Sequence, residues 1–490
     1  MSAVRSSLLL SAANSYVGLI LQVAGTAVIA RILTPLEVGV FAVASVFAAL
    51  GSTFRDFGVA EYLIQKKEVE AKDLRACFAV NLAASGLVGL VLLATAPLVG
   101  SFYGDPGVGA VMRVQALNFF LIPFGAVTLA WFRREMDFTP IFHASMASSL
   151  IQFVVSVWLA VQGHGYMALA WGSFAGVAIT VLVAMWHRPK WFPRWPGLAG
   201  TKDVVHFGKF ASGVFVAGQL SNGAPELTIG KLSGLADAGL YSRAVGVISM
   251  FERLIGQAVA PVCLPYLARG VREQGTVVPS LSLTTTLVTG VGWPFVFFLF
   301  LSAYPAVRIM YGPQWMAAVP VAQVLCCAVA VEMIFRFVNQ ALFSLGKPRE
   351  ANRLQFTQLG IRLLGLGLVV PYGLMGAAFG LLLAACLGAL VSAHALRRAA
   401  GFNWGHIWAA CRKSAAVAVL ACAPYAVVAA VWAASEANFV RHFLLGAALT
   451  GLAWVLAVWG TGHPVWGEVV NMARGVRSRL RAWQGGSTVK

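Results

Sequence analysis

The sequence predicts an all-α polytopic membrane protein, and its composition, its charge distribution and an internal repeat all support this fold class. Hydrophobic residues make up 59% of the 490 residues, whereas Asp, Glu, Lys and Arg together make up only 11%. Soluble domains carry about 25% of these charged residues, so the composition excludes a soluble enzyme, a disordered protein and a secreted disulfide scaffold. The seven cysteines have no metal-ligand spacing and are interpreted as small apolar helix residues.

Apolar runs long enough to cross a bilayer recur along the whole chain. A spanning helix needs about 20 mostly apolar residues. The first run exceeds a signal-peptide core, so we expect an uncleaved first helix. About fourteen helices are predicted, within 11–30, 38–54, 76–104, 114–132, 138–187 (two), 207–229, 239–262, 280–303, 319–341, 363–396 (two), 414–435 and 443–460.

The distribution of basic residues predicts the topology. With the N-terminus inside, 26 of the 36 Lys and Arg residues fall in cytoplasmic segments, five fall in the opposite segments and five lie within spans. Such a bias is the positive-inside pattern of membrane proteins. It places both termini in the cytoplasm, and it accounts for the net charge of +18 without nucleic acid.

The two halves of the chain resemble each other. Residues 31–41 align with 231–241 at an offset of 200, and later positions align at an offset of 208. Each repeat holds six predicted helices, so both copies share one orientation and flank a central cavity, as in transporters. We expect an N-terminal lobe at 1–200, a C-terminal lobe at 201–400, and two extra helices with a basic cytoplasmic tail at 401–490.

Repeat mates also occur at helix ends and along helix faces. Tyr103 matches Tyr311, and the glycines that follow these two residues match each other. In the sixth and twelfth predicted helices, small residues recur at every fourth position, which predicts close helix packing. These small residues are Ala168, Gly172 and Gly176, mirrored by Gly376, Gly380 and Ala384.

Several motifs resemble those of one known family, the Wzx-type polysaccharide flippases, and most of all its colanic-acid and xanthan exporter subgroup. The similar segments cover nearly the whole chain, and the family belongs to the multidrug/oligosaccharidyl-lipid/polysaccharide exporter superfamily. Where many members carry Asp or Asn before the second-half loop, this chain has Glu226. The motifs are 28–33, 54–60 followed by 64–66, 132–138, 239–241 and 311–315.

The resemblance implies transfer of an undecaprenyl-pyrophosphate-linked oligosaccharide from the inner to the outer leaflet of the bacterial inner membrane. Such transfer serves exopolysaccharide, capsule or O-antigen biosynthesis and proceeds by alternating access of the two lobes. We expect no cofactor, no metal and no catalytic residue. The expected partners are the lipid-linked oligosaccharide and membrane lipids, without nucleic acid. Contact with polysaccharide polymerase machinery is left open, and a monomer is expected.

Polar residues inside the predicted spans are candidates for lining the cavity. Gln219, Asn222 and Glu226 share one face of the seventh predicted helix, at spacings i, i+3 and i+7. Their repeat mates include Gln22 and Thr26 of the first predicted helix. Both helices are therefore expected to line a shared cavity, with interhelical hydrogen bonding as the alternative.

Ionisable residues inside the spans fall in the second half of the chain, where each costs about 2.5–3.5 kcal/mol. Arg243 and Arg253 share a stripe that could bind a pyrophosphate or else reach the headgroups. Glu332 and Arg336 are four residues apart with the acid first, which predicts either an intrahelical ion pair or cavity lining. Arg362 lies deep in the eleventh predicted helix without a local acidic partner, which makes it a further cavity candidate.

Two other functions compete with transport of a lipid-linked glycan. A cation-coupled drug extruder of the same superfamily would need acids for a cationic drug, whereas basic residues outnumber acids within these spans. A membrane-embedded glycan polymerase or acyltransferase would need a sizeable outside loop or a catalytic constellation. The sequence suggests no such constellation and contains no Walker-type phosphate loop.

Overall fold

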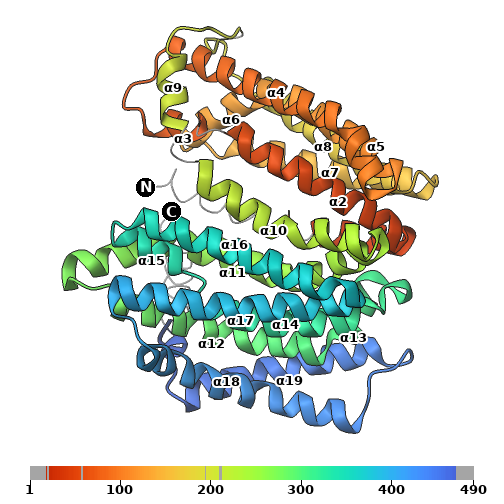
Figure 1. The fold of residues 1–490 in the computed structure, drawn as a ribbon, viewed down its shortest axis with the longest axis vertical. Coiled ribbons are helices and arrows are strands. Elements are labelled where there is room, and N and C mark those ends of the chain that lie inside the picture. Colours follow the sequence, from red (N-terminus) through yellow and green to blue (C-terminus); the bar gives the residue numbers. More distant parts are fainter. Residues whose placement is uncertain are drawn as a thin grey trace, which may run out of the picture. The chain divides into compact units, whose positions relative to one another are not determined.

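The computed structural model describes residues 21–56, 59–193, 195–208 and 212–468, together with residues 18 and 470. Every regular element within these residues is a helix, which confirms the predicted fold class. Residues 11–17 of the first predicted span and the basic tail lie outside the described residues. The chain folds into two compact units, whose helices are labelled in Figure 1 and which are described separately.

The two units do not follow one continuous stretch of sequence each. Unit 1 comprises Met1–Ser242, Met310–Trp315 and Leu366–Ala377. Unit 2 comprises Arg243–Ile309, Met316–Gly365 and Ala378–Lys490. Because these units are defined by contacts and the predicted lobes by the repeat, the lobe boundaries stay a prediction.

Unit 1 is built from the helices of the first repeat and from the start of the second. A helical segment, Leu21–Ile32, precedes its numbered helices. Its complete helices are α2 (Pro35–Asp56), α3 (Val59–Gln65), α4 (Ala71–Tyr103), α5 (Pro106–Leu121), α6 (Pro123–Arg134), α7 (Thr139–Val161), α8 (Tyr166–Trp186), α9 (Thr201–Gly208) and α10 (Ser212–Leu232).

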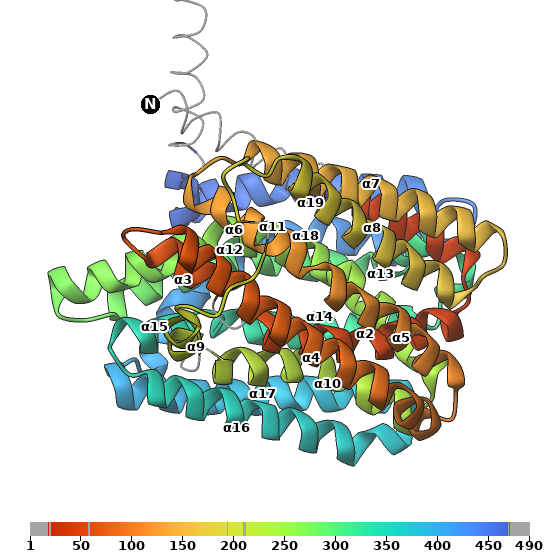
Figure 2. The same cartoon turned by 90° about the horizontal axis from the view of Figure 1, so that it is seen from above.

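Tight packing of small residues joins α7 to α8, which lie side by side in Figures 1 and 2. A Cβ atom added to Gly172 would lie 1.8 Å from the Ser156 hydroxyl oxygen, and one added to Gly176 would meet Gln152 at 3.1 Å. Ala168, one turn before Gly172, is buried. The small residues of α8 therefore allow close packing, as their spacing predicts.

The predicted span 114–132 is bent in the structure. Helices α5 and α6 meet at an angle of 55° at Ile122, and Pro123 begins α6. Proline lacks a backbone N–H and its ring clashes with the preceding turn, so a continuous helix cannot pass through this position undistorted. At the other end of α5, the Asp105 carboxylate accepts a hydrogen bond from the backbone N–H of Gly107 and caps the helix.

Unit 2 carries the remaining helices, and four helices cross the boundary between the units. Its core includes Leu267, Leu342 and Leu396, all fully buried. The helices within unit 2 are α12 (Val278–Leu301), α14 (Ala318–Ile334), α15 (Val338–Ser344), α18 (Trp404–Val431) and α19 (Phe439–Gly460). The helices that cross the boundary are α11 (Leu235–Gln274), α13 (Ala303–Tyr311), α16 (Pro348–Val369) and α17 (Gly373–Ala400).

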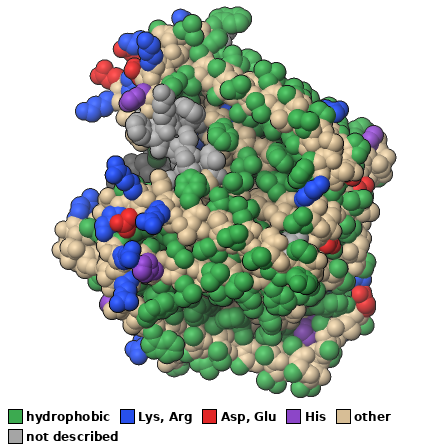
Figure 3. All heavy atoms as spheres, viewed as in Figure 1, with side chains coloured by type: hydrophobic (Ala, Val, Ile, Leu, Met, Phe, Trp, Pro, Cys, Tyr) green, Lys and Arg blue, Asp and Glu red, His purple; other side chains and the backbone are tan. Residues whose placement is uncertain are grey.

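Among the described residues, nine helices are long and apolar enough to cross a membrane, and the bent pair of α5 and α6 makes up to ten. The long helices α10, α11 and α16 have 21, 40 and 22 residues and more polar sequences. The chain is therefore a multi-pass membrane protein, and the count of fourteen spans stays a prediction. In each unit, hydrophobic side chains cover the sides of the helices on the face drawn in Figure 3, and most Lys and Arg side chains gather at one end.

The internal repeat is visible in the backbone. The repeat mates Gly104 and Gly312 have φ angles of +72° and +100°, and the mates Gly165 and Gly373 have +52° and +80°. Each pair lies at a helix end with a positive φ, where residues with a Cβ atom are strained. Glycines with a positive φ therefore recur at equivalent helix ends of both repeats.

Candidate functional site

An ion pair between two helices of unit 2 contains two of the predicted site residues, Arg362 and Glu332. Arg362 on α16 donates from Nη2 to Oε1 of Glu332 on α14 at 2.6 Å. The side chains are 24% and 43% exposed, so the pair lies on an open face of the unit and is not sealed in its core. Charge-assisted hydrogen bonds of this kind hold both groups in a defined orientation. The sequence offered Arg362 no local acidic partner, and the structure supplies one from another helix.

Glu332 and Arg336 do not share a continuous helix, so a pair between these two side chains stays a prediction. Helix α14 ends at Ile334, and residues 335–337 form a turn before α15 begins at Val338. The backbone N–H of Arg336 bonds the Met333 carbonyl, so Arg336 leaves the helical spacing on which the prediction depended. Arg336 is half-buried in this turn, next to the helix that carries Glu332.

Four carboxamide side chains on α15 and α16 were missed at the sequence level. Asn339 of α15 donates from Nδ2 to Oε1 of Gln355 on α16 at 3.0 Å. Gln340 and Asn352 extend the set on the same two helices. A signal existed, because Asn352, Gln355 and Arg362 recur at i, i+3 and i+10 on a helix with more polar residues than its neighbours.

The polar face predicted on the seventh helix, at the start of the second repeat, lies on α10, which belongs to unit 1. Gly223 and Gly230 of α10 pack against Val46 and Val43 of α2. Beside these glycines, two of the predicted side chains are half-buried and one is exposed. The half-buried side chains are Gln219 and Glu226, and the exposed one is Asn222.

The remaining predicted residues lie on the helical segment Leu21–Ile32 and on α11, and not all of their side chains are described. Gln22 is exposed and Thr26 is half-buried, both on the helical segment Leu21–Ile32 of unit 1. Arg243 is half-buried on α11, where unit 2 begins. Arg253 also belongs to α11, but its side chain lies outside the described residues. A cavity-lining role for these residues stays a prediction.

Within unit 1, the two repeats contact each other reciprocally where α2 and α11 begin. A Cβ atom added to Gly39 would lie 1.6 Å from the Leu235 carbonyl oxygen, and one added to Gly239 would lie 1.9 Å from the Pro35 carbonyl oxygen. Positions 35 and 39 are the repeat mates of 235 and 239, so the contact is pseudo-symmetric. Real Cβ atoms essentially never approach another atom within 3.0 Å, so only glycine is accommodated at these two positions.

Further contacts join the repeats at this end of unit 1. Gln314 and Trp315 both donate side-chain N–H groups to the Ala30 carbonyl oxygen, at 2.6 and 2.7 Å. The Tyr103 hydroxyl donates to the Leu227 carbonyl oxygen at 3.1 Å. Two motifs that carry the family resemblance, 28–33 and 311–315, are thus direct neighbours.

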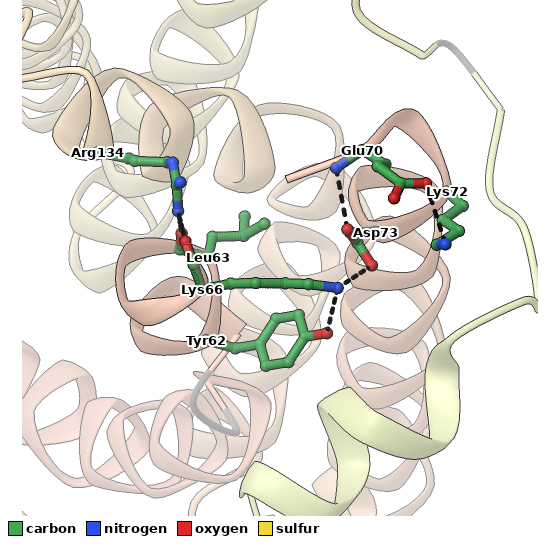
Figure 4. A network of polar contacts seen from close by, with 7 residues as sticks. All are labelled: Tyr62, Leu63, Lys66, Glu70, Lys72, Asp73 and Arg134. Atoms are coloured by element: carbon green, nitrogen blue, oxygen red, sulfur yellow. Dashed lines mark hydrogen bonds and ion pairs between the residues drawn. The ribbon is translucent and has the colours of Figure 1, made fainter. Parts of the chain in front are cut away.

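A polar network fixes the short helix α3 at the opposite end of α4 (Figure 4). Lys66 Nζ donates to the buried carboxylate of Asp73 at 2.6 Å and to the Tyr62 hydroxyl at 3.3 Å. The pKa of Lys66 is raised, chiefly because its ammonium donates this hydrogen bond to Asp73. Arg134 of α6 donates to the carbonyl oxygens of Leu63 and Lys66. These motif residues therefore cap and anchor a helix end.

In the part of the chain that the structure describes, no group of three or more His, Cys, Asp or Glu side chains could hold a metal ion.

A family model described as polysaccharide biosynthesis protein matches residues 28–320. A succinoglycan biosynthesis transport protein of Rhizobium meliloti (strain 1021), ExoT, is 27% identical over 300 residues, which are 60% of each chain. The lipopolysaccharide biosynthesis protein WzxC of Escherichia coli (strain K12) is 23% identical over 305 residues, 61% of each chain. The matched region thus spans about three fifths of the length of both relatives.

Two solved structures share the fold. The lipid II flippase MurJ in an inward closed conformation has a TM-score of 0.73 and 12% identity, covering 92% of this chain and 99% of its own. An inward-facing multidrug resistance MATE family transporter has a TM-score of 0.61 and 15% identity, covering 81% of this chain and 96% of its own. At these identities the likeness concerns the fold alone.

Proposed function

Because the chain belongs to the polysaccharide biosynthesis protein family, we propose that it flips an undecaprenyl-pyrophosphate-linked oligosaccharide from the cytoplasmic to the outer leaflet of the inner membrane. The names of two relatives, which refer to succinoglycan transport and lipopolysaccharide biosynthesis, support a lipid-linked glycan as substrate. The process served would be exopolysaccharide, capsule or O-antigen biosynthesis. The protein moves its substrate without changing it chemically, as a monomer, and needs no cofactor.

The observation that carries this proposal is the open ion pair of Glu332 and Arg362. An ionised group inside a membrane protein is costly unless it is paired or serves a polar pathway. Both side chains retain exposure on their face of unit 2, so the guanidinium can be reached by a ligand. A pyrophosphate competes well for this guanidinium, because its oxygens accept paired hydrogen bonds from the planar donor fork.

The reciprocal glycine contact supports alternating access as the mechanism. Contact between Gly39 and Leu235, together with its mate between Gly239 and Pro35, closes the outer ends of two repeat-related helices without intervening side chains. Such a backbone contact can separate without breaking a hydrophobic core. We infer that this contact is made in the state open to the cytoplasm and is broken when the substrate leaves outward.

The proposed orientation has both termini in the cytoplasm. In unit 1, the basic ends of α2, α4 and α6 carry Arg55, Lys72 and Arg134, on the side where the positive-inside pattern requires the cytoplasm. The glycine contact, at the start of α2, then lies on the outer side.

The test uses full-length protein in lipid vesicles that contain lipid-linked oligosaccharides extracted from cells lacking the protein. An added lectin reports the glycan on the vesicle exterior. We expect the wild type to expose the glycans of the inner leaflet and to leave their mass unchanged. Arg362→Ala should lose most of this activity per inserted molecule, and Arg362→Lys should keep part of it, because charge survives but the fork is lost. A longer or acylated product, or equal activity of wild type and Arg362→Ala, would contradict the proposal.

A further inference from the structure

A row of carboxamide side chains on α15 and α16 is only partly explained by the packing of unit 2. The carboxamide row consists of Asn339, Gln340, Asn352 and Gln355. One bond, from Asn339 to Gln355, joins its two helices. The side-chain oxygens of Asn339, Gln340 and Asn352 are buried, and among the described residues they accept no hydrogen bond. Buried acceptors without partners are costly, because their bonds to water are lost on folding and are not replaced.

Another carboxamide on the same helix, that of Gln358, is hydrogen-bonded to a neighbouring helix. Gln358 of α16 donates from Nε2 to the Ser392 hydroxyl of α17 at 2.9 Å, and Ser392 in turn donates to the Gly388 carbonyl oxygen. Figure 2 shows α16 and α17 side by side, as this bond requires. Interhelical bonding thus explains Gln358, whereas the carboxamide row keeps unused acceptors.

The carboxamide row and the ion pair lie on the same pair of chain segments. Gln355 and Arg362 are seven residues apart on α16, which places them about 10 Å apart along the helix axis. On the other segment, Asn339 follows Glu332 by the same number of residues, across the turn at 335–337. A charged end and a neutral polar end therefore follow each other along one face of unit 2.

The two ends suit the two chemically different parts of a glycan pyrophosphate. A carboxamide donates and accepts at once, as a sugar hydroxyl does, whereas a guanidinium only donates. We propose that the carboxamide row is a sugar-binding subsite, which contacts hydroxyl groups of the glycan near its pyrophosphate. This inference rests on the proposed function and adds to it the neutral sugar as a recognised part of the substrate. The row distinguishes a loaded lipid carrier from the sugar-free carrier.

The experiment compares two ligands on the same full-length protein in detergent. One ligand is undecaprenyl pyrophosphate without sugar. The other is the undecaprenyl-pyrophosphate-linked oligosaccharide extracted from cells lacking the protein. Asn352→Leu and Gln340→Leu remove acceptors that have no partner among the described residues, at nearly constant volume. Gln358→Leu is the matched control, because its carboxamide is hydrogen-bonded to Ser392. The measured quantity is the ratio of the two dissociation constants, together with the thermal stability of each variant.

We expect Asn352→Leu and Gln340→Leu to weaken binding of the glycan-carrying lipid by about tenfold, as the loss of one or two hydrogen bonds implies. Binding of the sugar-free carrier should remain unchanged, and neither variant should be less stable than the wild type, because the lost oxygens accept no hydrogen bond from the described residues. Gln358→Leu should lower stability and leave the ratio as it is. An unchanged ratio in both row variants, or an equal loss for both lipids, would overturn the subsite. A wild type that binds neither lipid would instead overturn the proposed function itself, and the subsite with it.

Discussion

Replacing Gly39 with alanine should force the starts of α2 and α11 apart. The added Cβ would lie 1.6 Å from the Leu235 carbonyl oxygen, and a tolerable contact needs at least 3.0 Å, so the helices must separate by about 1.4 Å. The neighbouring atom is backbone and cannot rotate away, unlike a flexible side chain. Forced overpacking of this kind typically costs 1–3 kcal/mol. The population of the closed contact should therefore fall by a factor of roughly 5 to 150.

The separation can be measured between spin labels at two exposed repeat mates. Leu36 and Ala236 lie next to the contact and are both exposed, so cysteines there can be labelled in an otherwise cysteine-free chain. We expect the wild type to show a dominant short distance, and Gly39→Ala to shift the distribution to longer distances. Gly239→Ala should have the same effect, because its added Cβ would lie 1.9 Å from the Pro35 carbonyl oxygen.

Gly86→Ala provides the matched control. Gly86 lies within α4, and a Cβ atom added there would meet nothing within 4 Å. This variant should leave the label distances and glycan export unchanged, whereas the two contact variants should lower export per inserted molecule. If Gly39→Ala and Gly239→Ala kept both the short distance and normal export, the contact would not be a gate, and the mechanism inferred from it would be refuted.

Two further predictions concern acid stability and topology. The pKa of His463 is lowered from 6.5 to about 4, first by burial and then by Lys413, so this imidazole is neutral in the folded state and its stabilisation is complete above pH 6.5. As the pH falls from 6.5 towards 4, the unfolded state binds the proton first. The free energy of unfolding should therefore be about 2 kcal/mol lower at pH 5 than above pH 6.5. Thermal unfolding at pH 7.5 and pH 5.0 should show a smaller drop in stability for His463→Gln than for the wild type. An identical drop in both proteins would exclude His463 as its source. For topology, an alkaline phosphatase fusion should be active after Gly104 or Ser435 and inactive after Arg194 or Lys490, and activity at Lys490 would reverse the orientation of the C-terminus.

The local structure around His463 gives a physical reason for its neutrality. Its Nδ1 accepts a hydrogen bond from the Val465 backbone N–H at 3.2 Å, and its Nε2 lies 3.1 Å from the Ser414 hydroxyl. A second proton would have to replace the Val465 bond at Nδ1. Gly290 packs against the ring so closely that a Cβ atom there would lie 2.3 Å from it. The hydrogen bond at Nδ1 and the burial of the ring therefore both oppose protonation of His463.

Much of the fold could be predicted because a bilayer restricts the possible solutions. Uncharged runs of about 20 residues can only be helices in a membrane, so the long helices between α2 and α19 lie close to the predicted spans. Repeat-matched glycines marked helix ends, because a positive φ favours glycine whatever surrounds it. Gly104 with Gly312, and Gly165 with Gly373, bear this out.

The site was harder to predict, because its contacts join residues distant in sequence. Nothing near Arg362 along α16 indicates Glu332, which lies thirty residues earlier on another helix. The end of α14 was hidden for a related reason. Residues 335–337 read Phe-Arg-Phe, without a glycine or proline to mark a break, so tertiary packing of Phe335 and Phe337 into the core determines the turn. A local pattern cannot reveal such a determinant.

The two repeats have kept the same backbone but have diverged in their side chains. At the offset of 208 residues, Glu332 and Arg362 correspond to Phe124 and Val154, and Asn352 corresponds to Ala144. Conformational demands on the chain apply equally to both copies, so helix-end glycines remain matched. An apolar residue at each mate position keeps the first copy free of the energetic penalty of membrane-embedded polar groups. The second copy bears that penalty at all three positions, which is expected where side chains bind a polar substrate and is unexplained if they serve only as a scaffold.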